Sequence, residues 1–147
     1  MLNLITDRSQ AHVNRLLALQ NRGWANMTAA EQEAWYGEIA KGAYNYTDLN
    51  RVETAVGVLA RILNMSLTTK TNWTMWDKPT QSDMSRYLGN VAKIRERCSF
   101  VKNLPTLPTD MNNLNYKAAN NIELVLLRVY EYMESCVQAG EIYSGEV

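Results

Sequence analysis

Apolar residues recur at every third or fourth position along most of this chain. This spacing places them on one face of an α-helix, whereas the alternation typical of strands is confined to short stretches. The clearest apolar stripe consists of Leu49, Val52, Val56, Leu59 and Leu63. The pattern predicts an all-α protein.

Capping signals divide the N-terminal third into two helices. Thr6 is expected to cap the first helix. Thr28 and Glu31 form a capping box for the second, because a hydroxyl and a carboxylate at this spacing accept hydrogen bonds from the free backbone N–H groups of a helix start. The second helix is expected to include Ile39 and to stop at residues 41–42.

Three longer helices follow. They are expected to begin near Thr47 or Asp48, after Pro79, and near Asn115. The last carries apolar residues on most of its faces, which favours a central position, and it is expected to end at Gly140. Gly57 and Gly89 fall inside helices, where close packing of a crossing helix or a bulky ring would explain the missing side chain.

Two long connections separate the last three helices. The first spans residues 65–79 and has the threonine content and alternation of extended chain, and the second contains Pro105 and Pro108. Residues 141–147 alternate in a β-like way after the last helix. We therefore expect a compact bundle of about five helices forming one domain over residues 1–140, followed by a short extended tail.

Composition and charge are those of an ordinary globular protein. The 147 residues are 46% hydrophobic and 20% charged, and fifteen basic side chains balance fifteen acidic ones. A neutral chain has no long-range attraction to DNA, RNA or anionic lipid, so we expect neither nucleic acid nor a membrane as partner. The apolar run at 124–127 is far shorter than the ~20 residues that cross a bilayer, and the N-terminus has no secretory signal pattern.

Residues that usually carry catalysis or bind metals are sparse. The single histidine, His12, lies in a helical pattern without partners at a metal-binding spacing. Glu131 and Glu134 lie near a helix end, where solvation is the ordinary outcome. Cys98 and Cys136 are expected to be reduced thiols in helices, and a disulfide is open only if two helix ends meet. The glycines form no phosphate-binding loop, so no enzymatic activity, cofactor or metal is expected.

Tryptophan and tyrosine carry the most informative chemistry. Four tryptophans and eight tyrosines accompany one phenylalanine, and their polar tips favour half-wet positions such as interfaces. Trp73 and Trp76, in the first long connection, are candidate partner contacts, with a core position equally open. Ile142 and Tyr143 are candidates in the tail, because an extended terminus can add as a strand to another subunit's sheet. A frayed terminus is the alternative there.

Short motifs spread over most of the chain carry a family resemblance. In order they are LITDR at 4–8, GWANMT at 23–28 leading into Glu31 and Trp35, GAYNYTDLNRVE at 42–53, TKTNW at 69–73 followed by Asp77 and residues 79–80, MSRYL at 84–88, and GEIYSGE at 140–146. With these stretches the chain resembles short helical domains encoded in tail and baseplate regions of phages and prophages of Gram-positive bacteria. None of the stretches is a catalytic motif.

The resemblance implies a structural part of a virion. Such a protein would be made in the cytoplasm of the host bacterium and would serve in the phage tail, baseplate or fibre as a scaffold or connector for other virion tail proteins. A homo-oligomer stays open, since such assemblies are commonly symmetric. Three alternatives remain: a small module that binds a receptor or host surface glycan through Trp73 and Trp76, a domain associated with a cell-wall hydrolase, and a helical regulator that binds nucleic acid.

Overall fold

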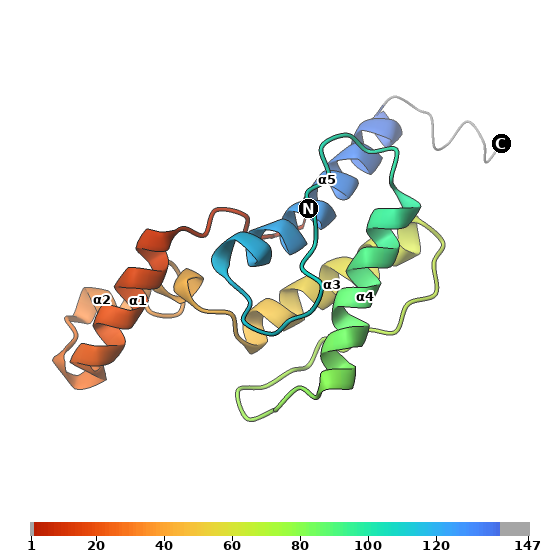
Figure 1. Ribbon diagram of the computed structural model, residues 1–147. Helices are drawn as coiled ribbons and strands as arrows, with labels where there is room; N and C mark the ends of the chain where they lie inside the picture. Colours follow the sequence, from red (N-terminus) through yellow and green to blue (C-terminus); the bar gives the residue numbers. More distant parts are fainter. Residues whose placement is uncertain (1, 139–147) are drawn as a thin grey trace.

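The computed structural model describes residues 2–138, and this part of the chain is all-helical. Its elements are α1 (Gln10–Arg22), the 3₁₀ helix η1 (Trp24–Asn26), α2 (Ala29–Ala34), the 3₁₀ helix η2 (Ile39–Gly42), α3 (Tyr46–Ile62), α4 (Gln81–Arg97) and α5 (Tyr116–Gln138). The prediction of an all-α fold with about five helices is confirmed. Helices α3, α4 and α5 form the bundle. Residues 10–42, which hold α1, η1, α2 and η2, extend from it, and we call them the arm (Figure 1).

The main hydrophobic core lies among α3, α4 and α5. Four of the five residues of the stripe predicted on the third helix are buried there, with Val52 and Leu59 0% exposed, and Leu63 is partly buried at the end of the helix. The facing residues are Val91 and Ile94 of α4 and Ile122, Val125, Leu126 and Val129 of α5. Because each fully buried side chain of this kind contributes about 1.5–3 kcal/mol, this cluster is the main source of the bundle's stability.

Side-chain caps set where two of the bundle helices begin. Asn45 caps α3 and Thr80 caps α4, and each forms a capping box with an aspartate three residues later, Asp48 and Asp83 respectively. Asn64 follows the end of α3 and has a φ of 54°, a left-handed conformation that cannot continue the helix. The boundaries of both helices therefore follow from local sequence.

The first helix begins later than predicted. Its N-cap is Ser9, in a capping box with the residue three positions on, and not Thr6. Residues 2–8, which we call the strap, run along the bundle instead, and the backbone N–H of Ile5 donates to Glu123 of α5. A long-range hydrogen bond to a buried carboxylate has displaced the local cap.

The second predicted helix is two short elements. α2 ends at Ala34, and a turn through Gly37 leads to η2. None of the α2 residues is buried, whereas Ile39 of η2 is 1% exposed. A helix this short has little stability of its own, so the burial of Ile39 determines the local conformation.

The arm has a small core of its own. Its buried members are Leu16 and Leu19 of α1, Met27, and Ile39 of η2. Here η2 approaches α1 so closely that a Cβ on Gly42 would lie 2.4 Å from the carbonyl oxygen of His12 and 2.8 Å from Cβ of Leu16. Gly42 is therefore a packing residue as well as a helix stop.

The two long connections are non-helical, as predicted, and both are tied to the bundle. Asn50 of α3 exchanges two hydrogen bonds with the backbone of Trp73, at 2.8 and 2.9 Å. Arg95 of α4 donates to the carbonyl oxygen of Pro105 at 2.8 Å. The packing expected at Gly89 is absent, because no neighbour lies within 4 Å of a Cβ built there, and Gly57 has only Thr69 at 4.0 Å.

Candidate partner-binding groove

Four charged side chains, three of them buried and the fourth half-buried, form a cluster between the strap, α3 and α5. Nη2 of Arg8 lies 2.9 Å from Oδ1 of Asp48 and 2.6 Å from Oε2 of Glu123. Arg51 pairs with the same two carboxylates, and its Nε is 2.7 Å from Oε1 of Glu123. Glu123 is 0% exposed, so the loss of either guanidinium would leave charge uncompensated in the interior. The cluster fixes the strap, and through it the start of the arm.

A second buried carboxylate holds the first long connection. Glu53 of α3 is 1% exposed and accepts from Nη1 of Arg86 at 2.5 Å. It also accepts from Nε1 of Trp73 at 2.7 Å and from the backbone N–H of Lys70 at 3.0 Å. Residues 74–79, which we call the loop, therefore project from an anchored base.

An open groove of about 1170 Å³ lies between the arm and the bundle. Its lining comes from the arm, the start of α3, both long connections and one face of α4. The large side chains among its lining residues are Trp35, Tyr36, Tyr44, Tyr46, Leu49, Trp73, Met75, Met84, Leu88, Leu107, Met111 and Leu114. In Figure 1 the arm and the loop flank this space. The walls belong to anchored elements, so the groove is formed before any partner binds.

The lining of the groove mixes large apolar side chains with polar ones such as Thr47, Gln81 and Asn112, and it has a slight acidic character. Its charged residues are Asp77 and Asp110, and no Lys or Arg of the described chain lines it. Both aspartates also accept hydrogen bonds from backbone N–H groups of their own turns. Aromatic rings and flexible methionines favour an apolar occupant by shape and dispersion, and the aspartates favour one with basic groups at its edge.

Two tyrosines keep the inner end of the groove uncharged. The hydroxyl of Tyr44, which lines the groove, is hydrogen-bonded to that of Tyr87 in the core. Burial raises the pKa of both phenols above the ordinary value of 10.0. Both groups are therefore neutral at physiological pH, and they offer neither a nucleophile nor a fixed charge.

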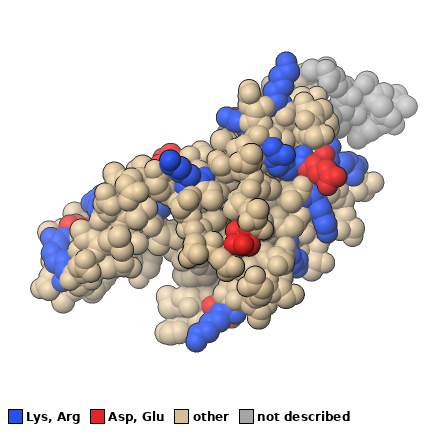
Figure 2. All heavy atoms as spheres, viewed as in Figure 1, with Lys and Arg blue, Asp and Glu red and all other residues tan. Residues whose placement is uncertain are grey.

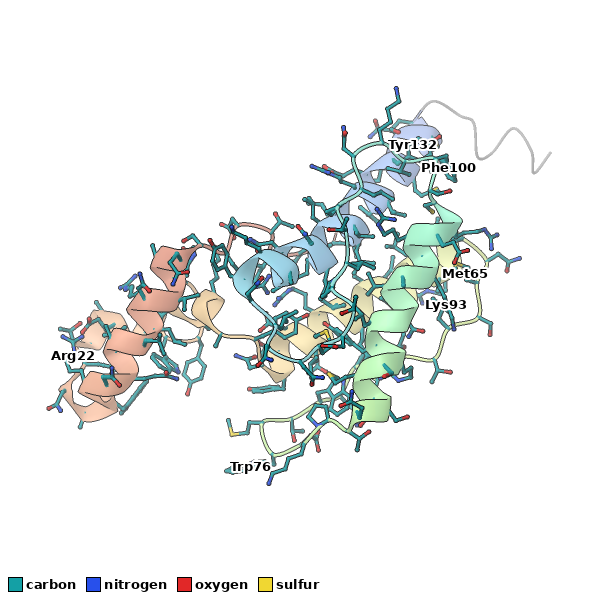
Figure 3. All side chains as sticks on the ribbon, viewed as in Figure 1. Arg22, Met65, Trp76, Lys93, Phe100 and Tyr132 are labelled. Atoms are coloured by element: carbon teal, nitrogen blue, oxygen red, sulfur yellow. The ribbon has the colours of Figure 1, made fainter. Side chains whose placement is uncertain are left out.

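The two candidate tryptophans take different places. Trp73 is 5% exposed and belongs to the main core, with its indole N–H bound to Glu53. Trp76 is 84% exposed and projects from the loop (Figure 3). The core alternative therefore holds for Trp73, and the surface position needed for a contact holds for Trp76. Ile142 and Tyr143 lie outside the described residues.

Several groove residues were missed by the sequence reasoning. Tyr36 of the arm is 77% exposed and Met75 of the loop is 59% exposed, and both line the groove. Gly89 lines it as well. No atom lies within 4 Å of a Cβ built on Gly89, so this position faces open space and needs no side chain to fill the core. A glycine inside a helical pattern was the one sequence feature that indicated the α4 wall of the groove.

The histidine and the two cysteines considered in the sequence lie outside the groove. Nε2 of His12 lies 2.8 Å from Oε1 of Glu38, and its Nδ1 lies 3.0 Å from the backbone nitrogen and from the hydroxyl oxygen of Ser9, its capping partner. This places the histidine in the contact between α1 and η2. Cys98 is buried and Cys136 half-buried, and both are free thiols. Burial raises the pKa of the Cys98 thiol.

Among residues 2–138 no three His, Cys, Asp or Glu side chains are grouped so that they could hold a metal ion. Within the same residues no helix combines the length and apolar character of a membrane span. Glu131 and Glu134 are exposed on α5. The groove is therefore the candidate functional site among the described residues.

Known proteins give no guide to the function of the groove. No protein-family model, no curated protein and no solved structure matches this chain.

Proposed function

We propose that this chain is a non-enzymatic structural protein of a phage tail, a scaffold or connector in the tail, baseplate or fibre. It acts by contact with neighbouring virion proteins, and it is made in the cytoplasm of the host bacterium. The sequence motifs that resemble tail and baseplate domains motivate the setting, and the groove motivates the mode of action.

One observation carries the mode of action: a groove whose lining includes large side chains that are exposed to solvent. Tyr36 and Met75 line it and are each more than half exposed, and Trp76, next to Met75 in the loop, is 84% exposed. Grouped side chains of this kind usually mark a binding surface. Because Glu53 and Glu123 anchor the walls, binding would order few additional residues, which improves affinity.

The test is the composition and assembly of purified particles. The gene is deleted from the phage or prophage that encodes it and is restored in trans as wild type, as Gly89→Trp or as Gly89→Ala. The bulky ring fills the groove from the wall of α4, whereas the alanine methyl group meets no neighbour. We expect the wild-type chain and Gly89→Ala in particles, and we expect Gly89→Trp to be excluded or to yield defective tails.

Two results would contradict the proposal. Complete, infective particles that form without the gene would remove the structural role. Particles that incorporate Gly89→Trp as fully as Gly89→Ala would leave the structural role in place and remove the groove from it. The far-ultraviolet circular dichroism of both purified variants shows whether each chain is folded.

Recognition of a host surface glycan is the second candidate function. The exposure of Tyr36 in the groove and of Trp76 on the loop favours it, because exposed flat aromatic rings can stack on sugar rings. Titration with a panel of cell-wall glycans should then quench tryptophan fluorescence in the wild type and not in Trp76→Ala. A wild type that responds to no glycan of the panel would end this candidate.

A further inference from the structure

The arm and the bundle are each packed on themselves. In the arm α1 packs against η2 and η1, whereas α3, α4 and α5 pack against one another. Their buried side chains form two separate cores. In the described part of the chain the ion pairs of the arm are internal, except that Nζ of Lys41 lies 3.0 Å from Oδ2 of Asp7 in the strap. Each part can therefore keep its own packing when its orientation relative to the other changes.

The first junction between the two parts falls at one peptide bond, between Arg8 and Ser9. The backbone of Arg8 exchanges two hydrogen bonds with the side chain of Asn120 in α5, at 3.0 and 2.9 Å. The backbone N–H of Ser9 instead donates to Nδ1 of His12, and its hydroxyl caps α1. Arg8 is thus tied to the bundle, and Ser9 is tied to the arm.

The second junction falls between Ala43 and Tyr44. The backbone N–H of Ala43 donates to the carbonyl oxygen of Ala40 in η2 at 3.1 Å, and Ala43 packs on the core of the arm. The hydroxyl of Tyr44 is hydrogen-bonded to that of Tyr87 in the main core, and the residue after Tyr44 caps α3. The guanidinium carbon of Arg8 lies 5.4 Å from the centre of the Tyr44 ring, so the bundle sides of the two junctions are in contact. Two neighbouring connections of this kind form a hinge.

Two hollows lie between the arm and the bundle. The groove is one of them, and Trp35, Tyr36 and Ala40 are its lining residues from the arm. The other has a volume of about 420 Å³ and lies between the arm, at Gln10 and Val13 among others, and the start of α5. Figure 2 shows the arm as a lobe that projects from the rest of the molecule. A rotation of the arm would change the shape of these open spaces and would leave both close-packed cores intact.

From these observations we propose that the arm pivots as a rigid body about the two junctions and thereby widens or narrows the groove. The wall that contains Trp35 and Tyr36 moves relative to the walls formed by α4, the loop and the second long connection. The cluster around Arg8 holds the pivot in place and leaves the orientation of the arm to the hinge. As a device that controls the access of a partner to the groove, the hinge rests on the proposed function.

The ion pair between Lys41 and Asp7 restrains the rotation. It joins η2 of the arm to the strap, beside the first junction. The side chain of Asp7 is 67% exposed, and exposed pairs of this kind contribute about 0–1 kcal/mol. The restraint is therefore weak, and it can be removed without disturbing either core.

The experiment measures residual dipolar couplings of the backbone N–H groups in the isotope-labelled full chain, in a weakly aligning medium. These couplings average over motions up to the millisecond range, which includes the motions of domain hinges. We expect the helices of the arm to fit one alignment tensor and α3, α4 and α5 to fit another. The tensor of the arm should have the smaller magnitude, because pivoting averages its couplings.

Asp7→Asn tests the restraint. This variant loses the ion pair to Lys41, so the alignment of its arm should fall below that of the wild type while the bundle keeps its own tensor. Glu33→Gln is the matched control, because it also removes one exposed carboxylate but lies on α2, away from the junctions. It should reproduce the wild-type tensors. An arm tensor that is unchanged in Asp7→Asn would overturn the role given to the ion pair.

Two outcomes would overturn the hinge itself. A single tensor that fits the arm and the bundle with one magnitude would show that the arm is fixed on the bundle. Couplings of the arm helices that fit no common tensor would show that the arm does not move as one body. Both outcomes leave the proposed function intact, since incorporation into particles requires no motion of the arm. A pivoting arm in a chain that is absent from particles would sink the proposed function and keep the hinge.

Discussion

Arg8 of the strap and Glu123 of α5 are 115 positions apart in sequence, and their side chains meet at 2.6 Å between Nη2 and Oε2. The pair joins the beginning of the described chain to its last helix. Because Glu123 also pairs with Arg51 and accepts from the backbone of Ile5, it connects the strap, α3 and α5 at a single point.

Replacing this carboxylate should destabilise the whole molecule. Glu123→Gln keeps the size of the side chain and removes its charge, so Arg8 and Arg51 are left with Asp48 alone. Breaking a buried ion pair in this way typically costs about 3–5 kcal/mol. Urea unfolding followed by circular dichroism should show that loss in the free energy of unfolding.

The matched control is Glu96→Gln, the same chemical change at an exposed position of α4. Surface substitutions of this kind stay within about 0.5 kcal/mol. Equal effects of the two substitutions would mean that the cluster around Glu123 is not a stabilising element.

This contact also marks the limit of what the sequence could predict about the fold. Caps and stripes are local, so the capping box of Thr28 and Glu31 was predictable. The strap was not, because nothing within a few residues of Thr6 indicates that Ile5 finds its acceptor on α5. The break after α2 was missed for a similar reason, since it depends on the burial of Ile39 against α1.

The two tryptophans of the first long connection should respond differently to truncation. Trp73→Ala empties a core position and takes the indole donor away from Glu53, which should cost about 3–5 kcal/mol of unfolding free energy. Trp76→Ala removes an exposed ring and should change stability by less than about 0.5 kcal/mol. Chemical denaturation of both variants measures the two changes in the free energy of unfolding. Losses of similar size would contradict the assignment of Trp73 to the core and of Trp76 to the surface.

Two glycine-to-alanine changes should have opposite signs. A methyl group on Gly42 would overlap the backbone of α1, so Gly42→Ala should displace η2 and destabilise the arm by about 1–3 kcal/mol. Gly89→Ala meets no neighbour and lies inside α4, so it should stabilise the helix by about 0.5–1 kcal/mol. Thermal unfolding of the two variants beside the wild type checks both signs. A lower stability of Gly89→Ala would show that the α4 wall of the groove is not open at this position.

The groove was beyond sequence reasoning because five segments build it. Its apolar residues come from the arm, the start of α3, α4 and both connections, and no segment contains enough of them to form a recognisable motif. The pattern identified the loop through Trp76 as a candidate surface, which agrees with its exposure. It could not separate Trp76 from Trp73, because the carboxylate that accepts the buried indole N–H of Trp73 belongs to Glu53, 20 positions away.

Acid should weaken the arm through the capping box of α2. The carboxylate of Glu31 accepts from the backbone N–H of Thr28 and from Arg22, and these hydrogen bonds lower its pKa below the ordinary value of 4.5. A group whose pKa is lower in the folded state stabilises that state above its unfolded pKa, and the stabilisation is lost as the pH falls through the folded value. The contribution should therefore be complete at neutral pH and should decline progressively as the pH falls below about 4.5.

Glu31→Gln and Glu33→Gln make the same change in charge and separate this effect from the general loss of carboxylate charge. Glu33 is exposed on the same short helix. Near-ultraviolet circular dichroism reports on the arm, because Trp24 and Trp35 form an edge-to-face pair there at 6.3 Å. At pH 7 we expect Glu31→Gln to melt below the wild type and Glu33→Gln to melt with it. Below pH 4 the wild type should approach Glu31→Gln, since its own carboxylate is then becoming protonated. A constant gap between the two from pH 7 to pH 3 would show that the carboxylate charge of Glu31 does not stabilise the arm.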